Sequence, residues 1–270
     1  MNPKVSIITV VYNGEKFIKK SIESVLNQTY KNIEYIIIDG QSKDQTLNIV
    51  KSYKDNIDLI ISEPDDGLYD AMNKGIRHAT GDIIGMINSD DYYNSSTVEL
   101  IVSQYKIYGN SYIYHGDMYI IDENDKIVEE LNSIPLSKYF MKNGCSIAHP
   151  TSFIPKKLYI EFGLYDNNFN IVADYDLLLR FVLKNKVPHC HIDKKLAYFR
   201  EGGISTDVLK TALQAHKARI RNGINKSESF VYYYRVKSFF YLKYILSFIG
   251  LERPIVYIYR KFISNNHRIK

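Results

Sequence analysis

Four short apolar runs alternate with segments of helical periodicity at the start of this chain. The runs cover residues 4–12, 33–39, 58–62 and 83–87, and Val and Ile dominate them. Strands that are buried on both faces of a sheet have this composition. Between the runs, apolar residues recur three or four positions apart, which predicts helices. Repeated alternation of strand and helix predicts βαβ units and a parallel sheet, so the fold class is α/β.

Polar side chains follow each of the four runs. In an open parallel sheet the carboxyl ends of the strands meet at one edge, and ligands bind in the crevice beyond it. Turns alone would not need so many carboxylates, so we expect a binding site at this edge. The residues concerned are Tyr12 and Asn13, Asp39, residues 63–66, and Asp90 with Asp91.

The second half of the sequence alternates less regularly. A strand is expected over 112–121, paired in a hairpin with 127–131 across the sequence DENDK, and residues 158–162 predict a short helix. A stronger helix is predicted over 174–185. Its first turn holds Asp174 and Asp176, where the helix dipole favours negative charge. We therefore expect a mostly parallel central sheet with helices on both faces.

The adjacent carboxylates Asp90 and Asp91 indicate a metal site. Two neighbouring carboxylates repel each other and are costly to bury unpaired. Mg²⁺ and Mn²⁺ prefer oxygen ligands and are often shared with the phosphates of a substrate. Zinc is not expected, because no Cys or His cluster has the spacing of a zinc site. The expected cofactor is therefore Mn²⁺ or Mg²⁺.

The composition changes near residue 225, which divides the chain into a body, 1–225, and a helical tail, 226–270. The tail holds nine Lys or Arg against two Glu, a local charge of +7, so the body carries −2 of the total of +5. It also holds twelve of the 36 Tyr and Phe residues, and Pro254 divides it into two helical pieces. This composition is typical of helices at a membrane surface. The alternative is a helical pair packed on the body or on a second copy of the chain; nucleic acid is not expected, because the tail is more hydrophobic than base stacking requires.

Other features indicate a cytoplasmic protein, either free or peripheral at the inner face of the plasma membrane. No uncharged apolar stretch reaches the length of about 18 residues that a transmembrane helix needs. The first residues lack the pattern of a signal peptide. The two cysteines, Cys145 and Cys190, fit a reducing compartment, although a disulfide between them stays open.

Several segments resemble the inverting family 2 glycosyltransferases, which have the GT-A fold. They are VSIITVVYNGEKFIKKSIESVLNQTY, IIIDGQSKDQT, SEPDDGLYDAMNKGI and GDIIGMINSDD, followed by HPTSF, FGLYDNNFNIVADYDLLLR and FREGGIS. Their order and spacing agree with the family over about residues 4 to 205. The chain is most similar to bacterial enzymes that build capsule, O-antigen and exopolysaccharide.

The resemblance implies roles for the residues that bind the nucleotide. Asp39 would contact uracil, the ring of Tyr12 would lie beside the base, and Thr9 and Val10 would line the pocket through their backbone. Asp90 would lie near the ribose and Asp91 would ligate the metal; the leading acid of the usual motif is replaced by Asn88.

Other matched positions concern the phosphates and the chemistry. Asn73 would bind the nucleotide in a motif that reads AMN, where Met72 replaces the Arg that many members have, so an arginine contact is missing or comes from Lys74 or Arg77. Arg200 would pair with the diphosphate from a loop with a flexible Gly pair. Asp174 matches the catalytic base, although Ala173 replaces the Glu before it; Asp176 is its rival. His149 matches a histidine of the acceptor region, or is a hydrogen-bonded structural residue.

Transfer with inversion is an in-line displacement that needs a carboxylate to accept the proton of the attacking hydroxyl. The resemblance therefore implies transfer of a hexose or N-acetylhexosamine from a UDP-sugar to a saccharide, usually lipid-linked, with formation of a β-linkage. One alternative is a sugar nucleotidyltransferase, but the loop after the first strand has a single Gly. Another is a non-catalytic nucleotide-sugar binding module, which would be expected to lack Asp174. A dinucleotide oxidoreductase is excluded, because no G-x-G-x-x-G follows the first strand.

Overall fold

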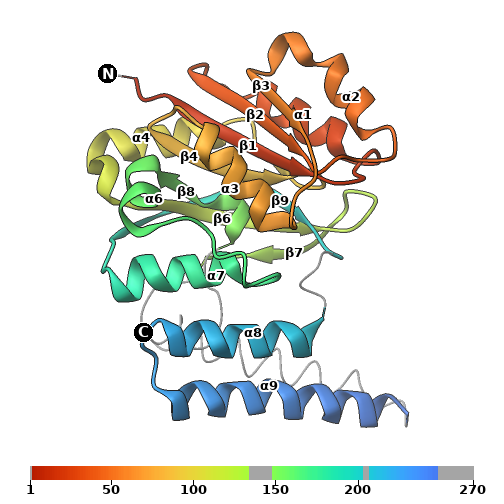
Figure 1. Cartoon of the computed structure of the whole chain (residues 1–270), viewed down its shortest axis with the longest axis vertical. Helices are drawn as coiled ribbons and strands as arrows, with labels where there is room; N and C mark the ends of the chain where they lie inside the picture. Colours follow the sequence, from red (N-terminus) through yellow and green to blue (C-terminus); the bar gives the residue numbers. More distant parts are fainter. Residues whose placement is uncertain (1, 134–147, 203–206, 249–270) are drawn as a thin grey trace.

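A computed structural model describes residues 2–133, 148–202 and 207–248, and its central layer is a sheet of nine strands (Figure 1). The four predicted N-terminal strands are present and parallel, in the spatial order β3-β2-β1-β4. Register brings their carboxyl ends together, since Val11 pairs with Asp39 and Val10 with Asn88. Their bounds are β1 (Val5–Val11), β2 (Ile33–Asp39), β3 (Leu59–Ser62) and β4 (Ile83–Asn88).

The rest of the sheet is mixed, and its strands come from the second half of the chain. The predicted hairpin of β6 (Ile113–Ile121) and β7 (Ile127–Leu131) is confirmed. The sheet continues from β4 through β8 (Phe153–Pro155) and β6 to β9 (His189–Arg200), which runs parallel to β6, and ends with β5 (Tyr92–Tyr93). The sequence did not predict β9, the longest strand.

Helices cover both faces of the sheet, as expected, because alternate side chains of β1 enter two different cores. Ile8 and Val10 pack under α3 (Leu68–His78), α6 (Lys156–Phe162) and α7 (Ala173–Leu178). Ile7 and Val11 pack under α1 (Ile18–Leu26), α2 (Thr46–Ser52) and α4 (Thr97–Tyr108). The contact between α3 and β1 is close, since a Cβ on Gly75 would lie 2.4 Å from Cγ2 of Ile8. The predicted helix over 174–185 divides into α7 and a π-helical segment, Leu179–Lys184.

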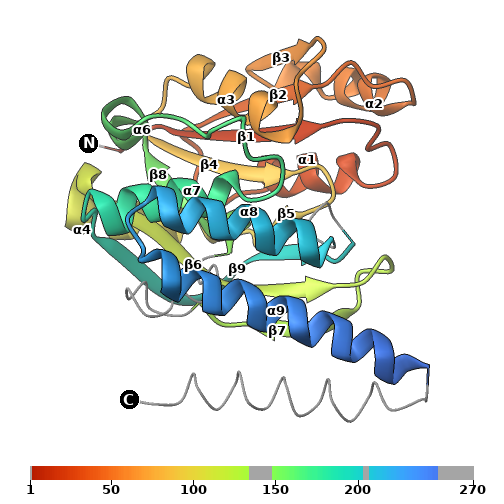
Figure 2. The same cartoon turned by 60° about the horizontal axis from the view of Figure 1, so that its bottom comes forward.

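Two long helices form outer layers beyond α7. Helix α8 (Val208–Arg221) packs on α7 and α9 (Lys226–Ser247) packs on α8, so the sheet and the three helices are stacked in sequence (Figures 1 and 2). Helix α9 begins at the predicted start of the tail, and position 225 as a domain boundary stays a prediction. Pro254 and the second helical piece lie outside the described residues, as does Cys145; Cys190 is a free cysteine. Within the described ranges, no helix is both long and apolar enough to cross a bilayer.

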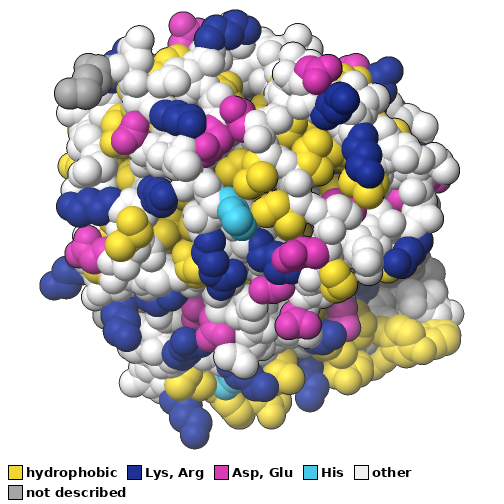
Figure 3. Space-filling model, turned by 45° about the horizontal axis from the view of Figure 1, so that its top comes forward, with side chains coloured by type: hydrophobic (Ala, Val, Ile, Leu, Met, Phe, Trp, Pro, Cys, Tyr) yellow, Lys and Arg dark blue, Asp and Glu magenta, His cyan; other side chains and the backbone are white. Residues whose placement is uncertain are grey.

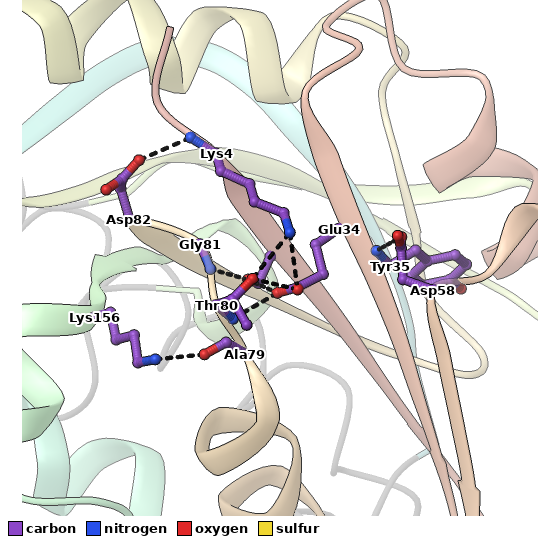
Figure 4. Close-up of polar contacts among 10 residues, drawn as sticks. Lys4, Glu34, Tyr35, Asp58, Ala79, Thr80, Gly81, Asp82 and Lys156 are labelled. Carbon is purple, nitrogen blue, oxygen red and sulfur yellow. Dashed lines mark hydrogen bonds and ion pairs between the residues drawn. The ribbon is translucent and has the colours of Figure 1, made fainter. Parts of the chain in front are cut away.

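A polar network holds the amino ends of the parallel strands together, at the edge opposite the predicted site (Figure 4). The carboxylate of Glu34, on β2, accepts hydrogen bonds from Ser6 Oγ at 2.5 Å, Thr80 N at 2.7 Å, Thr80 Oγ1 at 2.5 Å and Lys4 Nζ at 3.0 Å. Burial opposes the charge of Glu34, but these donors outweigh it and lower its pKa to about 2. Glu34 therefore joins β1, β2 and the loop before β4.

Replacing Glu34 by Gln should reduce the free energy of unfolding by about 2 kcal/mol at neutral pH, because an amide cannot accept all these hydrogen bonds. The folded-state pKa of Glu34 is lowered, so its contribution is present above its ordinary pKa of 4.5 and is lost as the pH falls toward 2. Urea denaturation at several pH values should show the difference between the two proteins vanish in acid. Glu129→Gln, on the exposed face of β7, is the control; an equal loss there would contradict the role of the network.

Three histidines meet where β6 and β9 pair. The ring of His115, fully buried, lies 5.3 Å from the ring centroids of both His189 and His191. His115 Nε2 is 3.2 Å from His189 Nδ1, and His191 Nε2 is 2.8 Å from Oδ1 of Asp117. Burial, with the neighbouring histidines, lowers the pKa of His115 to about 3. His115 is therefore neutral in the folded chain.

The pKa of His115 predicts a loss of stability in mild acid. Between about 3 and its ordinary pKa of 6.5, the unfolded chain binds one more proton at this position than the folded chain. The free energy of unfolding should therefore decrease as the pH is lowered from 6.5 toward 3, by up to about 1.4 kcal/mol per pH unit. His115→Phe should flatten this slope in urea denaturation, whereas His78→Phe, at the exposed end of α3, should leave it unchanged. An unaltered slope in His115→Phe would assign the acid sensitivity to other groups.

Candidate active site

A cavity of about 670 Å³ opens at the carboxyl ends of the parallel strands. One wall comes from β1 and the turn after it, a second from the start of α3, and a third from the end of β4. The second half of the chain closes it with residues before β8, the segment leading into α7, and the end of β9. The cavity therefore lies at the edge where the sequence predicted a site. The lining residues that are not acidic include Phe17, Leu68, Tyr69, Met118, His149, Asn170 and Phe199.

Five of the predicted site residues line this cavity: Val10, Tyr12, Asp90, Asp174 and Arg200. They come from four separate parts of the sequence, and the fold brings them to one cavity. The ring of Tyr12 is 62% exposed, so it is accessible to a planar ligand. His149, the predicted acceptor-side histidine, also lines the wall.

Two predicted residues use their side chains elsewhere. Thr9 is fully buried, and its Oγ1 is 3.0 Å from the hydroxyl of Tyr35 on β2. Asn73 donates from Nδ2 to the carbonyl oxygen of Tyr165 and to Asn167 Oδ1, and its Oδ1 accepts from Tyr165 N. Asn73 thereby fastens the loop before α7 to α3. A contact of Thr9 with a nucleotide would have to be made by its backbone, and both the amide nitrogen and the amide oxygen of Asn73 already have partners in the protein.

Asp39 is fully buried at the end of β2, adjacent to the cavity wall. Its carboxylate accepts from Ser62 Oγ at 2.6 Å and from Ser42 N at 3.2 Å. Asp65 lines the cavity beside it: a Cβ on Gly40 would lie 2.6 Å from Oδ2 of Asp65. Burial, and to a smaller extent the charge of Asp39, raises the pKa of Asp65. The two acids form an anionic corner next to Tyr12.

The acids after β4 are placed differently from each other. Asp90 faces the cavity, whereas Asp91 is 1% exposed and accepts from Arg200 N at 2.9 Å and from Asn88 Nδ2 at 3.2 Å. Burial raises the pKa of both carboxyl groups, and the charge of Asp90 adds to the effect on Asp91. A cation beside them would relieve this cost.

The donor atoms at this end of β4 fit a hard divalent cation. Oδ1 of Asn88 is buried and accepts no hydrogen bond in the part of the chain that the structure describes, although Asn88 lines the cavity. An unpaired amide oxygen beside two carboxylates is an oxygen donor set of the kind that Mg²⁺ and Mn²⁺ prefer. The described residues contain no cluster of three or more Asp, Glu, His or Cys side chains that could hold a metal without further ligands. A cation here would need oxygens from a substrate.

Arg200 is anchored in the protein, with its guanidinium lying over the ring of Phe17 at 4.0 Å from the centroid. Its Nε donates to the carbonyl oxygen of Asp90, and its terminal nitrogens donate to the carbonyl of Asp122 and to Oδ1 of Asp125 in the β6–β7 turn. Arg200 thus joins the end of β9 to β4 and to the hairpin. The glycine-containing loop that follows it is described only as far as Gly202. Phe17, the residue before α1, was not predicted as a site residue, because nothing in the sequence places its ring under a cation.

Asp174 and Asp176 point in different directions from the first turn of α7. Oδ1 of Asp174 accepts from Tyr69 OH at 3.0 Å and from Tyr175 N at 2.8 Å. Asp176 is 1% exposed and accepts from Asn222 Nδ2 at 2.8 Å on the side of α8, away from the cavity; burial raises its pKa. Asp174 is therefore the carboxylate of this turn that a bound substrate can reach. Tyr69 was not predicted as a site residue, because the motif matched on α3 concerned Asn73 and its neighbours.

His149 lies on the same side of the cavity as Asp174. Its Nε2 is 2.8 Å from the hydroxyl of Tyr165. Burial lowers the pKa of His149, although the charge of Asp174 opposes the shift. A neutral imidazole bonded to a buried tyrosine suits binding of a polar ligand more than proton transfer at this position.

Comparison with known proteins gives one consistent family. The profile of Glycosyl transferase family 2 matches residues 6–185. An uncharacterized glycosyltransferase of Rickettsia typhi is 30% identical over 203 residues, which cover 70% of this chain and 62% of that protein. The chain thus spans about three fifths of that relative.

Two solved structures show the same fold. S. aureus TarS in complex with UDP-GlcNAc superposes with a TM-score of 0.64 at 18% identity, covering 84% of this chain and 69% of that one. The mannosyltransferase PcManGT of Pyrobaculum calidifontis, in complex with GDP-Man and Mn²⁺, gives a TM-score of 0.61 at 15% identity, covering 83% and 66%. At these identities the likeness establishes the GT-A fold and not the ligand.

The raised pKa of Asp91 predicts that this carboxylate lowers the stability of the fold, although we expect it to bind the metal. The folded chain holds the Asp91 proton more tightly than the unfolded chain, so the contribution of this group to stability is lost as the pH rises. Asp91→Asn should therefore raise the melting temperature near neutral pH by about 3 °C. The new amide can still accept from Arg200 N, and a flip of the Asn88 amide would present Oδ1 to its N–H. The substitution should also abolish any further rise on addition of Mn²⁺ with a nucleotide diphosphate. Asp66→Asn, an exposed acid nearby, is the control; a Mn²⁺ effect that survives in Asp91→Asn would remove Asp91 from the metal site.

Proposed function

The chain belongs to glycosyl transferase family 2, and from this membership we propose that it transfers a hexose or N-acetylhexosamine from a UDP-sugar to a saccharide acceptor, with inversion. One observation carries the proposal. A single cavity has oxygen donors for a divalent cation at the end of β4 and the accessible carboxylate of Asp174 at α7. Displacement at a sugar carbon needs groups of these two kinds on opposite sides of the reacting centre.

The nucleotide would lie against β1 and β2. The exposed ring of Tyr12 can stack on a base, and Asp65, which lines the cavity, offers an acceptor to the N–H of uracil. Asp39 is fully buried behind it and would have to become accessible to contact the base. Binding of UDP-GlcNAc by TarS and of GDP-Man by PcManGT supports a nucleotide sugar without choosing the base. The match of Asp39 to the uracil-binding acid favours UDP.

Asp90, Asp91 and Oδ1 of Asn88 are the groups that would hold Mn²⁺ or Mg²⁺. When bound, the ion would supply positive charge that stabilises the departing diphosphate. Arg200 would add a second positive charge at this end of the cavity. Its anchoring to Asp125 means that it acts from a fixed position.

Asp174 would accept the proton of the acceptor hydroxyl. Within the described residues, Tyr69 OH and Tyr175 N both reach Oδ1, so Oδ2 is the oxygen that would act as the base. The carbonyl oxygen of Ile171 lies 2.8 Å from the hydroxyl of Tyr69, so its single proton is shared between two acceptors, and both hold the hydroxyl beside the carboxylate. Attack from this side would convert the α-linkage of a sugar nucleotide into a β-linkage. We propose a saccharide of a cell-surface polysaccharide, carried on a lipid, as the acceptor.

A pair of substitutions on one turn of α7 tests the assignment of the base. Asp174→Asn should reduce turnover by about 10²–10⁴-fold, measured as release of UDP from a panel of nucleotide sugars with Mn²⁺ and an acceptor saccharide. Its affinity for UDP, measured by calorimetry, should stay near that of the unmodified protein. Asp176→Asn is the matched control and should keep its turnover, because Asp176 faces α8.

Turnover retained in Asp174→Asn would place the base elsewhere. Failure of every nucleotide sugar to bind, with the protein folded, would contradict the transferase proposal as a whole. Binding of the sugar nucleotide without release of UDP from any acceptor would instead favour the non-catalytic binding module.

A further inference from the structure

A stripe of exposed apolar side chains runs along α9. Successive members are one, three or seven positions apart, spacings that place them on one side of a helix. Each is at least 44% exposed. Figure 3 shows hydrophobic side chains gathered at the lower right margin, where the end of α9 lies in Figure 1. The stripe consists of Phe230, Val231, Tyr234, Tyr241, Leu242, Ile245 and Phe248.

The opposite face of α9 is fixed to α8, so the direction of the stripe is determined. Ser229 is 1% exposed, and its hydroxyl accepts from Arg219 Nε at 3.0 Å and lies 2.8 Å from His216 Nδ1. The guanidinium of Arg219, fully buried, lies 4.5 Å from the centroid of the Tyr232 ring. These contacts turn the stripe away from the body of the protein.

The charges on α9 are almost all positive. The helix carries four Lys or Arg residues, and Glu228 is its single acid. Arg235 and Lys243 are exposed on α9, and Lys237 Nζ lies 5.8 Å from the ring of Tyr234 in the stripe. An apolar face rich in aromatic residues and bordered by cations is complementary to the headgroup region of an anionic bilayer.

We propose that α9 lies in the surface of an anionic lipid bilayer, with the stripe of Phe230 to Phe248 buried among the headgroups and the neighbouring cations paired with lipid phosphates. The helix does not span the bilayer, in agreement with its hydropathy. The stripe and its charges carry this proposal without the catalytic assignment. A failed transferase assay would not contradict the membrane proposal, and absence of membrane binding would not contradict the transferase proposal.

The chain contains no tryptophan, so one introduced residue reports on a single position. Tyr241→Trp, in the full chain, should show a blue-shifted emission with vesicles of phosphatidylcholine and phosphatidylglycerol, and brominated lipids should quench it. Ile160→Trp, on α6 and 76% exposed, is the matched control and should show neither change. Equal responses of the two probes, or none in Tyr241→Trp, would overturn the proposal.

Flotation of the full chain with the same vesicles tests the energetics. Loss of one inserted apolar side chain in Ile245→Glu should weaken partitioning by about tenfold or more, whereas Ile160→Glu should leave it unchanged. Flotation should also decrease with added salt, because the attraction of the cations to lipid is screened. If the chain does not float, and Ile245→Glu converts a dimer into a monomer in light scattering, the stripe is a subunit interface and the proposal is wrong.

Discussion

The buried carboxylate of Asp91 is the constraint to which the rest of the site responds. It lies at the end of β4 in a position 1% exposed, next to a second acid, and the protein gives it only a backbone N–H and an amide. A charge held in this way is costly unless a cation is near. Among the described residues Oδ1 of Asn88 has no partner, and Nε of Arg200 donates to the carbonyl of Asp90, so the surroundings suit an anionic ligand that brings a metal with it.

The first half of the fold could be predicted because local pattern and global position coincide there. A parallel sheet covered on both faces needs continuous apolar strands, and their acids must then fall at one edge. Asp39, Asp90 and Asp91 follow from that rule alone. The second half could not be predicted to the same degree, since β9 carries charged residues and its pairing with β6 joins segments far apart in sequence.

The site residues also fall into two groups, those that a sequence motif predicts and those whose roles depend on the fold. Asp174 was predicted from its place in a motif, and the structure distinguishes it from Asp176, because Asp174 lines the cavity and Asp176 is buried against α8. Sequence spacing could not predict that the amide of Asn73 would donate to the carbonyl of Tyr165 in the loop before α7, or that Phe17 would lie under Arg200. Such roles depend on side-chain direction and on contacts between distant segments. A one-dimensional pattern does not contain either.

The stacking of α7, α8 and α9 links the outermost helix to the cavity. Asp176 of α7 is bonded to Asn222 at the end of α8, and α8 holds Ser229 of α9 through Arg219 and His216. The turn that presents Asp174 is thus braced from behind by two helices that never touch the cavity. Helices α8 and α9 therefore support the position of Asp174. Substitutions in them can change the geometry of the cavity as well as the outer surface of the protein.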